Sequence, residues 1–180
     1  MNLILFGFKG CGKSHFGKLL AQKMHRHFID TDDLIVELFA KKTGQHTLPR
    51  EIYVQLGSEH FRALEKEALE SLKHVKNSVI ALGGGAVLSL ENVEFLQKLG
   101  CLVYLSTSAE TLQKRILKHQ TPAFLDSLNP EVSFLEVYQE RRPIYESIPA
   151  TKIDCDTLDE AGILAQLQSL LVLQDPPNGF

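Results

Sequence analysis

Short apolar runs alternate along the chain with longer stretches in which apolar residues recur at helical spacing. Five short segments are predicted to be strands, at 3–6, 27–29, 79–82, 102–105 and 151–154, and the first is a continuous apolar run typical of a strand buried on both faces. After the first run, Phe16, Leu20 and Met24 fall on one face of a helix predicted over 13–24. Because strands that alternate with helices favour βαβ units, the pattern predicts an α/β fold with a largely parallel sheet.

The remaining stretches predict further helices and one long loop. A helix is expected at 32–42, ending near Gly44, and another begins around Pro49 and is interrupted at Gly57. Ser89 and Ser108 are typical N-caps for the two helices that follow the third and fourth strands. Weak periodicity and two prolines predict a mobile loop at 118–130. The last helices are predicted at 132–146 and 158–173.

Length and composition narrow the protein class. The chain has 180 residues, of which 44% are hydrophobic and 23% charged, as in an ordinary soluble domain. A net charge of −3 gives no sign of a nucleic-acid or membrane partner, and three cysteines without metal-ligand spacing favour reduced thiols. No secretory signal or membrane-length apolar run is seen. We expect one cytoplasmic domain over 1–173 and a frayed tail at 174–180.

The first strand runs into a phosphate-binding motif. Residues 7–14 match G-x-x-x-x-G-K-[ST], and an amphipathic helix follows, as this motif requires. Backbone N–H groups of such a loop face nucleotide phosphates, Lys13 reaches the β- and γ-phosphates, and the Ser14 hydroxyl binds Mg²⁺. A plain glycine-rich turn is the alternative. The predicted ATP-binding residues here are Gly7, Lys9, Gly10, Cys11, Gly12, Lys13, Ser14 and His15.

Carboxylates follow the second strand at Asp30, Asp32 and Asp33. This is the strand end at which α/β sheets bind ligands. A phosphoryl-transfer site needs one carboxylate near the metal and another near the acceptor hydroxyl. An N-cap role for Asp30 or Asp32 is an equally good reading of these residues alone.

Together with three further motifs, these residues resemble the shikimate kinase family. The motifs are Gly57-x-x-x-Phe61-Arg62-x-x-Glu65, then Gly83-Gly84-Gly85-Ala86-Val87, then Arg141-x-Pro143-x-Tyr145. The resemblance spans roughly 3–154 and implies ATP-dependent phosphorylation of the 3-hydroxyl of shikimate. It also implies a three-layer P-loop kinase fold with a five-stranded parallel sheet of order 2-3-1-4-5. Substrate-binding helices are then expected at about 32–73 and a lid at about 118–130.

The resemblance also implies a role for each site residue. Lys13 and Asp32 would be catalytic, with Asp32 holding the acceptor, and Asp30 would join Ser14 near Mg²⁺. The shikimate carboxylate would be clamped by Arg62 and Arg141, and Glu65 would hold Arg62. The remaining implied contacts are Gly83, Gly84 and Gly85 along the substrate and Arg115 near the adenine. Independently, a planar guanidinium suits a carboxylate bidentately, although Arg62 and Glu65 could form an ordinary surface salt bridge.

The chain departs from the family pattern in the lid. The family carries Arg-Pro-Leu there, and its arginine reaches the transferring phosphate, whereas this chain reads Thr121-Pro122-Ala123. Such an arginine is worth orders of magnitude in rate. Lys118, His119 and Lys9 are the candidates to replace it.

Other functions stay open at this level. A gluconate or nucleoside-monophosphate kinase would share the architecture, and a weakly catalytic nucleotide-binding relative would fit the altered lid. The two arginines favour an anionic acceptor, and the Phe-Arg-x-x-Glu motif favours shikimate. We therefore expect a monomer that uses Mg²⁺, ATP and shikimate, and that has no nucleic-acid or membrane partner.

Overall fold

The structure is a computed structural model that describes residues 1–116, 118, 122–126 and 128–174. Its centre is a sheet of parallel strands in the order β2-β3-β1-β4-β5. The strands are β1 (Asn2–Phe6), β2 (His27–Asp30), β3 (Ser78–Ala81), β4 (Gly100–Ser106) and β5 (Thr151–Asp154). This order confirms the sheet that the family resemblance implies.

β1 lies at the centre of the sheet and is covered on both faces. Leu3 and its two successors are fully buried, and Leu3 pairs in register with Val79 of β3 and with Cys101 of β4. A strand buried on both faces needs an uninterrupted apolar run, which is the pattern found in this stretch of sequence. The loop that leaves β1 therefore starts from a fully buried strand paired on both sides.

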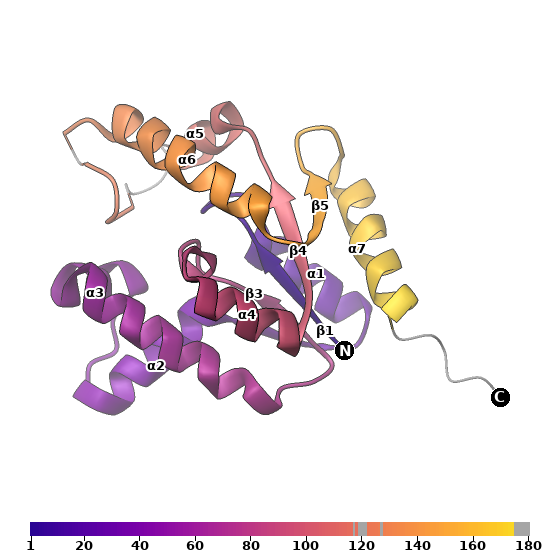
Figure 1. The fold of residues 1–180 in the computed structure, drawn as a ribbon, viewed down its shortest axis with the longest axis horizontal. Coiled ribbons are helices and arrows are strands. Elements are labelled where there is room, and N and C mark those ends of the chain that lie inside the picture. The colour runs from indigo at the N-terminus through magenta and orange to yellow at the C-terminus, as the bar shows by residue number, and fades with distance from the viewer. Residues whose placement is uncertain (117, 119–121, 127, 175–180) are drawn as a thin grey trace.

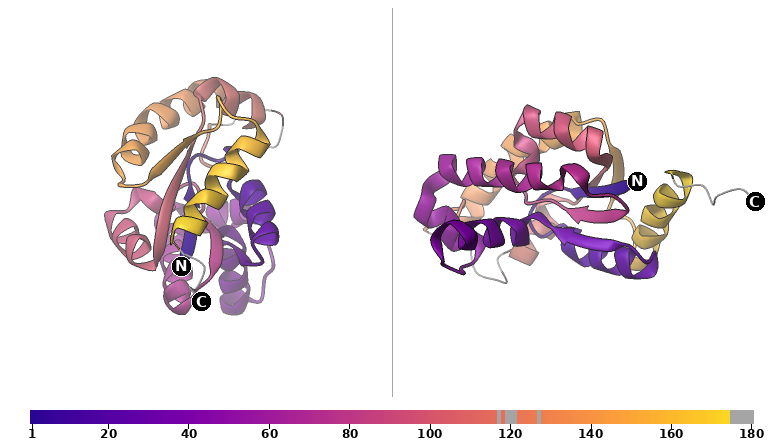
Figure 2. Two further views of the ribbon diagram at one scale, coloured as in Figure 1. Left: turned by 90° about the vertical axis from the view of Figure 1, so that its right-hand side faces the viewer. Right: turned by 90° about the horizontal axis from the view of Figure 1, so that it is seen from below.

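Helices cover both faces of the sheet and complete three layers (Figures 1 and 2). On one face, α1 (Lys13–Lys23) contacts α7 (Glu160–Gln174). On the other, α4 (Leu90–Leu99) contacts β4, and α6 (Pro130–Ser147) contacts α5 (Ala109–Ile116). Short 3-10 helices, η1 (Ser71–His74) and η2 (Ala86–Leu88), flank β3. The predicted N-caps are confirmed, since Ser89 accepts a hydrogen bond from the Asn92 amide and Ser108 accepts one from the Thr111 amide.

Two helices form a lobe at one end of the sheet. α2 (Thr31–Thr43) and α3 (Pro49–Glu70) pack together around an apolar cluster separate from the main core. The predicted interruption at Gly57 is present, because its φ of 75° and ψ of 170° break the helical geometry inside α3. The buried members of this cluster are Ile35, Phe39, Ile52, Phe61, Leu64 and Ala68.

The predicted lid and tail are only partly described. Of the lid at 118–130, residues 119–121 and 127 lie outside the described residues, and so do 175–180 of the tail. The described residues 122–126 are not helical, as predicted, and α6 begins at Pro130, two residues earlier than expected. Gln174, where the tail was predicted to begin, still belongs to α7. No helix in the described ranges combines the length and apolar character needed to cross a bilayer.

Candidate active site

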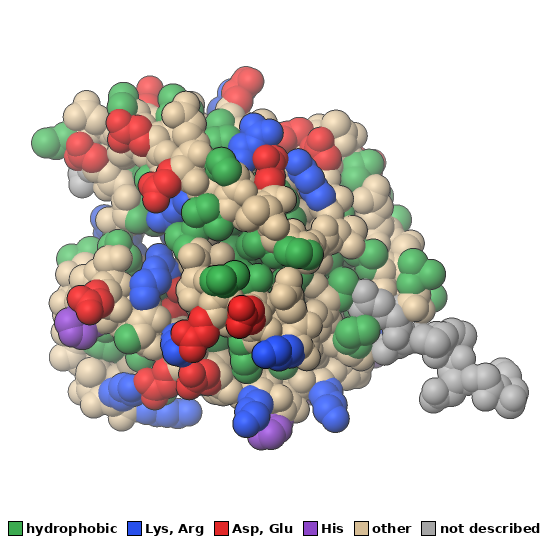
Figure 3. Space-filling view, viewed as in Figure 1, with side chains coloured by type: hydrophobic (Ala, Val, Ile, Leu, Met, Phe, Trp, Pro, Cys, Tyr) green, Lys and Arg blue, Asp and Glu red, His purple; other side chains and the backbone are tan. Residues whose placement is uncertain are grey.

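A cavity of about 370 Å³ lies where the chain leaves β1, β2 and β3. Since the strands are parallel, their carboxyl ends bring the three following loops together at one edge. Figure 3 shows this face hollowed between α6 and the α2–α3 lobe, with Lys and Arg side chains near the opening. Among the described residues, the charged side chains of the lining are Lys9, Lys13, Arg50, Arg62 and Arg141 against Asp30, Asp32 and Glu65. Although the chain as a whole is acidic, the cavity is locally basic and suits anionic ligands.

The phosphate loop is assembled around Lys13. Gly12, with φ of 103°, occupies the left-handed region that favours glycine and leads directly into α1. The buried Lys13 ammonium donates hydrogen bonds of 2.9 Å to the carbonyls of both Gly7 and Phe8. The third N–H of the ammonium faces the sulfur of Cys11, with Nζ 3.8 Å from Sγ, and this weak contact can be exchanged for a phosphate oxygen. The loop is thus held in a curled conformation by its own lysine.

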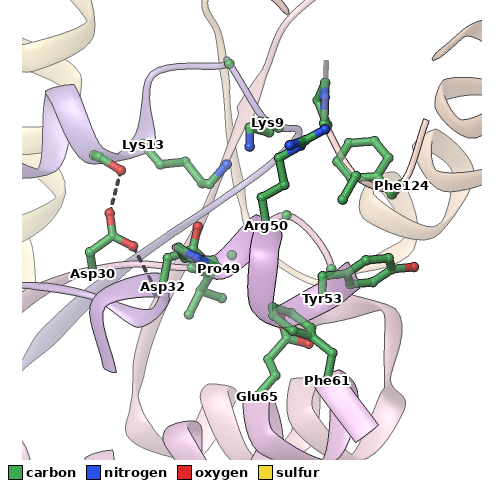
Figure 4. A pocket seen from close by; sticks show the side chains of 18 of the residues that line it. Lys9, Lys13, Asp30, Asp32, Pro49, Arg50, Tyr53, Phe61, Glu65 and Phe124 are labelled. Carbon is green, nitrogen blue, oxygen red and sulfur yellow. Dashed lines mark hydrogen bonds between the residues drawn. The ribbon is translucent and has the colours of Figure 1, made fainter. Parts of the chain in front are cut away.

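Ser14 and Asp30 form the oxygen-rich corner of the cavity. The Ser14 hydroxyl donates to Oδ2 of Asp30 at 2.6 Å, and Oδ1 of Asp30 accepts the backbone N–H of Asp32 at 3.1 Å (Figure 4). Mg²⁺ prefers hard oxygen ligands and keeps several waters, so a hydroxyl and one carboxylate beside phosphates fit it. The described residues contain no cluster of three or more His, Cys, Asp or Glu side chains able to hold a metal alone. The corner therefore fits a metal that arrives with the nucleotide.

Asp32, in the first turn of α2, reaches across to the glycine-rich turn after β3. A Cβ added to Gly83 would stand 2.7 Å from Oδ1 of Asp32, so only glycine leaves room for this carboxylate. The neighbouring Thr31 hydroxyl fixes the turn by accepting the Gly83 N–H at 2.8 Å. Burial, and then the charge of Asp30, raise the pKa of Asp32 above its ordinary 3.8, while Lys13 and Lys9 oppose the rise. A carboxylate with a raised pKa is a better proton acceptor than an ordinary aspartate.

Arg62 and Glu65 are joined on one face of α3. Nη1 of Arg62 lies 2.6 Å from Oε2 of Glu65, and Glu65 is almost fully buried at 1% exposure. Burial raises the pKa of Glu65 above its ordinary 4.5, and Arg62 partly offsets the rise. The Arg62 guanidinium lies against the backbone of Gly85, with no space for a Cβ there. Arg62 is therefore oriented from two sides, which a surface salt bridge would not achieve.

Arg141, on α6, approaches from the opposite wall. Its guanidinium lies over the ring of Phe124, with Cζ 4.9 Å from the ring centroid, in a cation–π contact. One turn further along α6, the hydroxyl of Tyr145 donates to the Gly84 carbonyl. Burial raises the pKa of Tyr145 to about 12, so this donor stays protonated at neutral pH. α6 is thus tied directly to the glycine-rich turn.

Most of the residues predicted from sequence meet in this cavity. Those that line it are Lys9, Gly10, Gly12, Lys13, Ser14, His15, Asp30, Asp32, Arg62, Gly83, Gly84, Gly85 and Arg141. Gly7 and the fully buried Cys11 do not line it and form the underside of the loop. Arg115 is exposed, does not belong to the described lining, and donates to the Gly10 carbonyl at 3.0 Å.

Of the three residues considered as replacements for the lid arginine, Lys118, His119 and Lys9, the two that the structure describes differ in their position relative to the cavity. Thr121 and His119 lie outside the described residues. Lys118 is exposed and is not part of the described cavity lining, whereas Lys9 belongs to it.

Several lining residues were not singled out from the sequence. Tyr53 forms an aromatic wall with Phe61 of the family motif, with ring centroids 5.3 Å apart. The break at Gly57 lies between the two residues, so the helical pattern does not reveal that they are neighbours. Phe124 sits in a segment without periodicity. One feature of the sequence could have pointed to Arg50: it lies in the first turn of a helix, where a cation opposes the helix dipole. The other residues missed are Pro49, Leu82, Pro122 and Ala123.

Comparison with known proteins identifies the family. The sequence model of shikimate kinase matches residues 9–171. The chain belongs to the shikimate kinase family. It is 35% identical to a shikimate kinase of Syntrophus aciditrophicus, over 92% of this chain and 88% of that one. It is 37% identical to one of Caldanaerobacter subterraneus, over 80% and 81%. The solved structure of an Acinetobacter baumannii shikimate kinase in complex with shikimate superposes with a TM-score of 0.78 at 32% identity, covering 96% of this chain and 91% of that one. Membership confirms the resemblance and makes this protein a kinase.

Proposed function

We propose that this protein transfers the γ-phosphoryl group of ATP to the 3-hydroxyl of shikimate. One observation supports this most directly: a phosphate loop and two arginines suited to a carboxylate line a single cavity, with Asp32 in the same lining. Shikimate is a small ring with one carboxylate and three hydroxyls, so it needs such a combination.

The acceptor carboxylate would lie between Arg62 and Arg141. Glu65 and Gly85 hold the first guanidinium, while Phe124 supports the second. Two planar forks from different helices fix both the position and the rotation of a carboxylate. The backbone of the turn at 83–85 would line the ring, because glycine lets main-chain atoms approach closely.

The hydroxyl to be phosphorylated would face Asp32. Its carboxylate would orient the hydroxyl and accept its proton as the oxygen attacks the γ-phosphorus in line with the departing ADP. Lys13 and the N–H groups of the loop would bind the phosphate oxygens. Ser14 and Asp30 would hold Mg²⁺, which supplies neutralisation of phosphate charge. Residues 122–124, which already line the cavity, would help to exclude water.

The surroundings of the enzyme are also part of the proposal. We expect it to act as a monomer in the cytoplasm, where its three free cysteines would stay reduced. Arg115, which contacts the loop backbone at Gly10, would lie near the adenine.

An ADP-release assay with MgATP tests the function. Shikimate is compared with gluconate, AMP and no acceptor, and the product is identified by mass spectrometry and ³¹P NMR. The proposal expects rapid release only with shikimate and a phosphate ester at its 3-hydroxyl. Faster release with another acceptor would move the function within the fold. Nucleotide binding without turnover on any acceptor would overturn the catalytic assignment.

A further inference from the structure

Arg50 is a third arginine of the cavity, and the sequence motifs leave it without a role. It lies in the first turn of α3, and its partly buried side chain belongs to the lining. In Figure 4 it runs from α3 toward the phosphate loop and points to the same end of the cavity as Lys9 and Lys13. Glu65 and Phe61 lie at the other end in this view. Cationic groups from two separate elements thus converge at the phosphate end.

Helix formation does not account for an arginine at this position. The first turn of a helix carries a partial positive charge, so a cation there typically costs about 0.3–1 kcal/mol. The rest of the turn is well formed, because Glu51 accepts hydrogen bonds from the Thr47 hydroxyl and from the Leu48 amide at 3.4 Å. These hydrogen bonds and the charge of Arg50 lower the pKa of Glu51, so the turn tolerates the cation, and it is the position of Arg50 in the cavity lining that indicates a function.

The backbone that carries Arg50 is fixed in place. Ile52, two residues further on, is fully buried in the cluster between α2 and α3. A guanidinium on a packed helix is positioned more accurately than one on a loop. The segment on the opposite side of the cavity offers no equivalent group, since the only Lys or Arg in the sequence between 116 and 140 is Lys118. Lys118 is absent from the described lining.

We propose that the Arg50 guanidinium binds the transferring γ-phosphoryl group and stabilises the charge on its oxygens during transfer. This inference rests on the proposed function. In the step, a bond forms between the acceptor oxygen and the γ-phosphorus while the bond to the β–γ bridging oxygen breaks. ADP leaves with that electron pair, and the hydroxyl proton passes to Asp32. Arg50 keeps its protons throughout and contributes only charge and hydrogen bonds.

The chemistry favours an arginine in addition to the two lysines. Lys9 and Lys13 are point charges, whereas a guanidinium presents a planar fork that matches two oxygens of a phosphoryl group. Charge in a loose phosphoryl-transfer transition state spreads over three equatorial oxygens. A fork directed at two of them therefore stabilises the transition state more than the bound substrates, and its loss should lower kcat more than it raises KM.

The test compares Arg50→Gln with Arg142→Gln. Arg142 is an exposed arginine on α6, paired with Glu146 outside the cavity, and serves as the matched control. In single-turnover rapid-quench experiments at saturating ATP and shikimate, Arg50→Gln should transfer phosphoryl about 100-fold more slowly than wild type. The KM for shikimate should change less than threefold, and Arg142→Gln should behave as wild type. A kcat within threefold of wild type, or a loss confined to the KM for shikimate, would overturn the proposal.

Chemical rescue separates a phosphoryl contact from a structural role. Guanidinium ion at tens of millimolar should raise the transfer rate of Arg50→Ala at least tenfold. Urea has the same planar shape but is neutral, and it should not raise that rate. Equal failure of both additives would mean that Arg50 acts through the fold, against the proposal. The wild-type rate with shikimate is measured first. Its absence would overturn the proposed function itself, while a normal rate in both wild type and Arg50→Gln would overturn the role of Arg50 alone.

Discussion

The guanidinium of Arg62 lies directly against the backbone of Gly85, in space that any side chain at that position would fill. Two segments far apart in the sequence, α3 and the turn after β3, are thereby matched in shape. Gly84 differs, because a Cβ there would meet only the Lys9 amide nitrogen at 3.5 Å and the Gly7 carbonyl oxygen at 3.9 Å, which are ordinary contacts. Neither Gly84 nor Gly85 has a positive φ, so alanine is compatible with the backbone of both.

Gly85→Ala should therefore displace Arg62. We expect the KM for shikimate to rise at least tenfold while the KM for ATP changes little, since the phosphate loop is untouched. Gly84→Ala should have the smaller effect on the shikimate KM. Steady-state kinetics with each substrate varied in turn give both constants. The reverse order of the two variants would mean that Arg62 is not held against the turn.

Glu65→Gln should stabilise the fold at neutral pH and weaken shikimate binding. The raised pKa of Glu65 means that the folded state favours its protonated form, so the ionised carboxylate lowers the free energy of unfolding at pH 7. Glutamine removes this charge, and we expect a gain of about 1 kcal/mol at pH 7. The gain should appear as the pH rises above 4.5, the ordinary value, and vanish below it, where the wild-type carboxyl is protonated in both states.

Thermal unfolding of both proteins between pH 4 and pH 7 measures this difference. A lower unfolding midpoint for Glu65→Gln at pH 7 would show that the ion pair with Arg62 outweighs the cost of burial.

Lys13→Ala should abolish phosphoryl transfer. The ammonium is expected to neutralise phosphate charge, and its loss should lower kcat by roughly a thousandfold or more. The carbonyls of Gly7 and Phe8 each lose one hydrogen bond, which is a local loss in a loop that follows a fully buried strand. Circular dichroism should therefore show an intact fold. Near-normal turnover in this variant would refute the assignment of the phosphate loop.

Phe124 should contribute through the face of its ring. Phe124→Leu keeps apolar bulk but removes the cation–π contact with Arg141, worth about 0.5–1 kcal/mol, so the KM for shikimate should rise about two- to fivefold. Phe124→Tyr keeps the aromatic face and should stay close to wild type. Titration of shikimate at saturating ATP compares the three proteins. Equal constants for Leu and Tyr would show that the ring supplies only bulk.

The sequence was sufficient for the parts of the fold and site that depend on local pattern. The strands are predicted because a buried parallel strand requires an apolar run, and the phosphate loop is predicted because its chemistry fixes the spacing of Gly7, Gly12 and Lys13. Asp32 and Arg62 follow from their neighbours in the chain and from the family resemblance.

Other contacts depend on how distant segments pack. Phe124 reaches Arg141 only because a non-periodic segment lies across α6, and no spacing in the sequence encodes that. Arg50 enters the cavity because α2 and α3 bury Ile52 between them. The contact of Arg115 with the Gly10 carbonyl also joins segments far apart in the sequence, and its expected place near the adenine stays a prediction.

Asp30 gives the two halves of the active site a common anchor. One of its oxygens accepts the N–H of Asp32 at the start of α2, and the other accepts the hydroxyl of Ser14, which we propose lies next to the nucleotide. If bound MgATP shifts this carboxylate, we therefore expect the start of α2, and with it Asp32, to shift as well. Thermodynamic coupling is reciprocal. If bound MgATP raises the affinity for the acceptor by some factor, bound acceptor must raise the affinity for MgATP by the same factor. In Asp30→Asn, whose side chain has only one oxygen for these two tasks, that mutual factor should fall toward one.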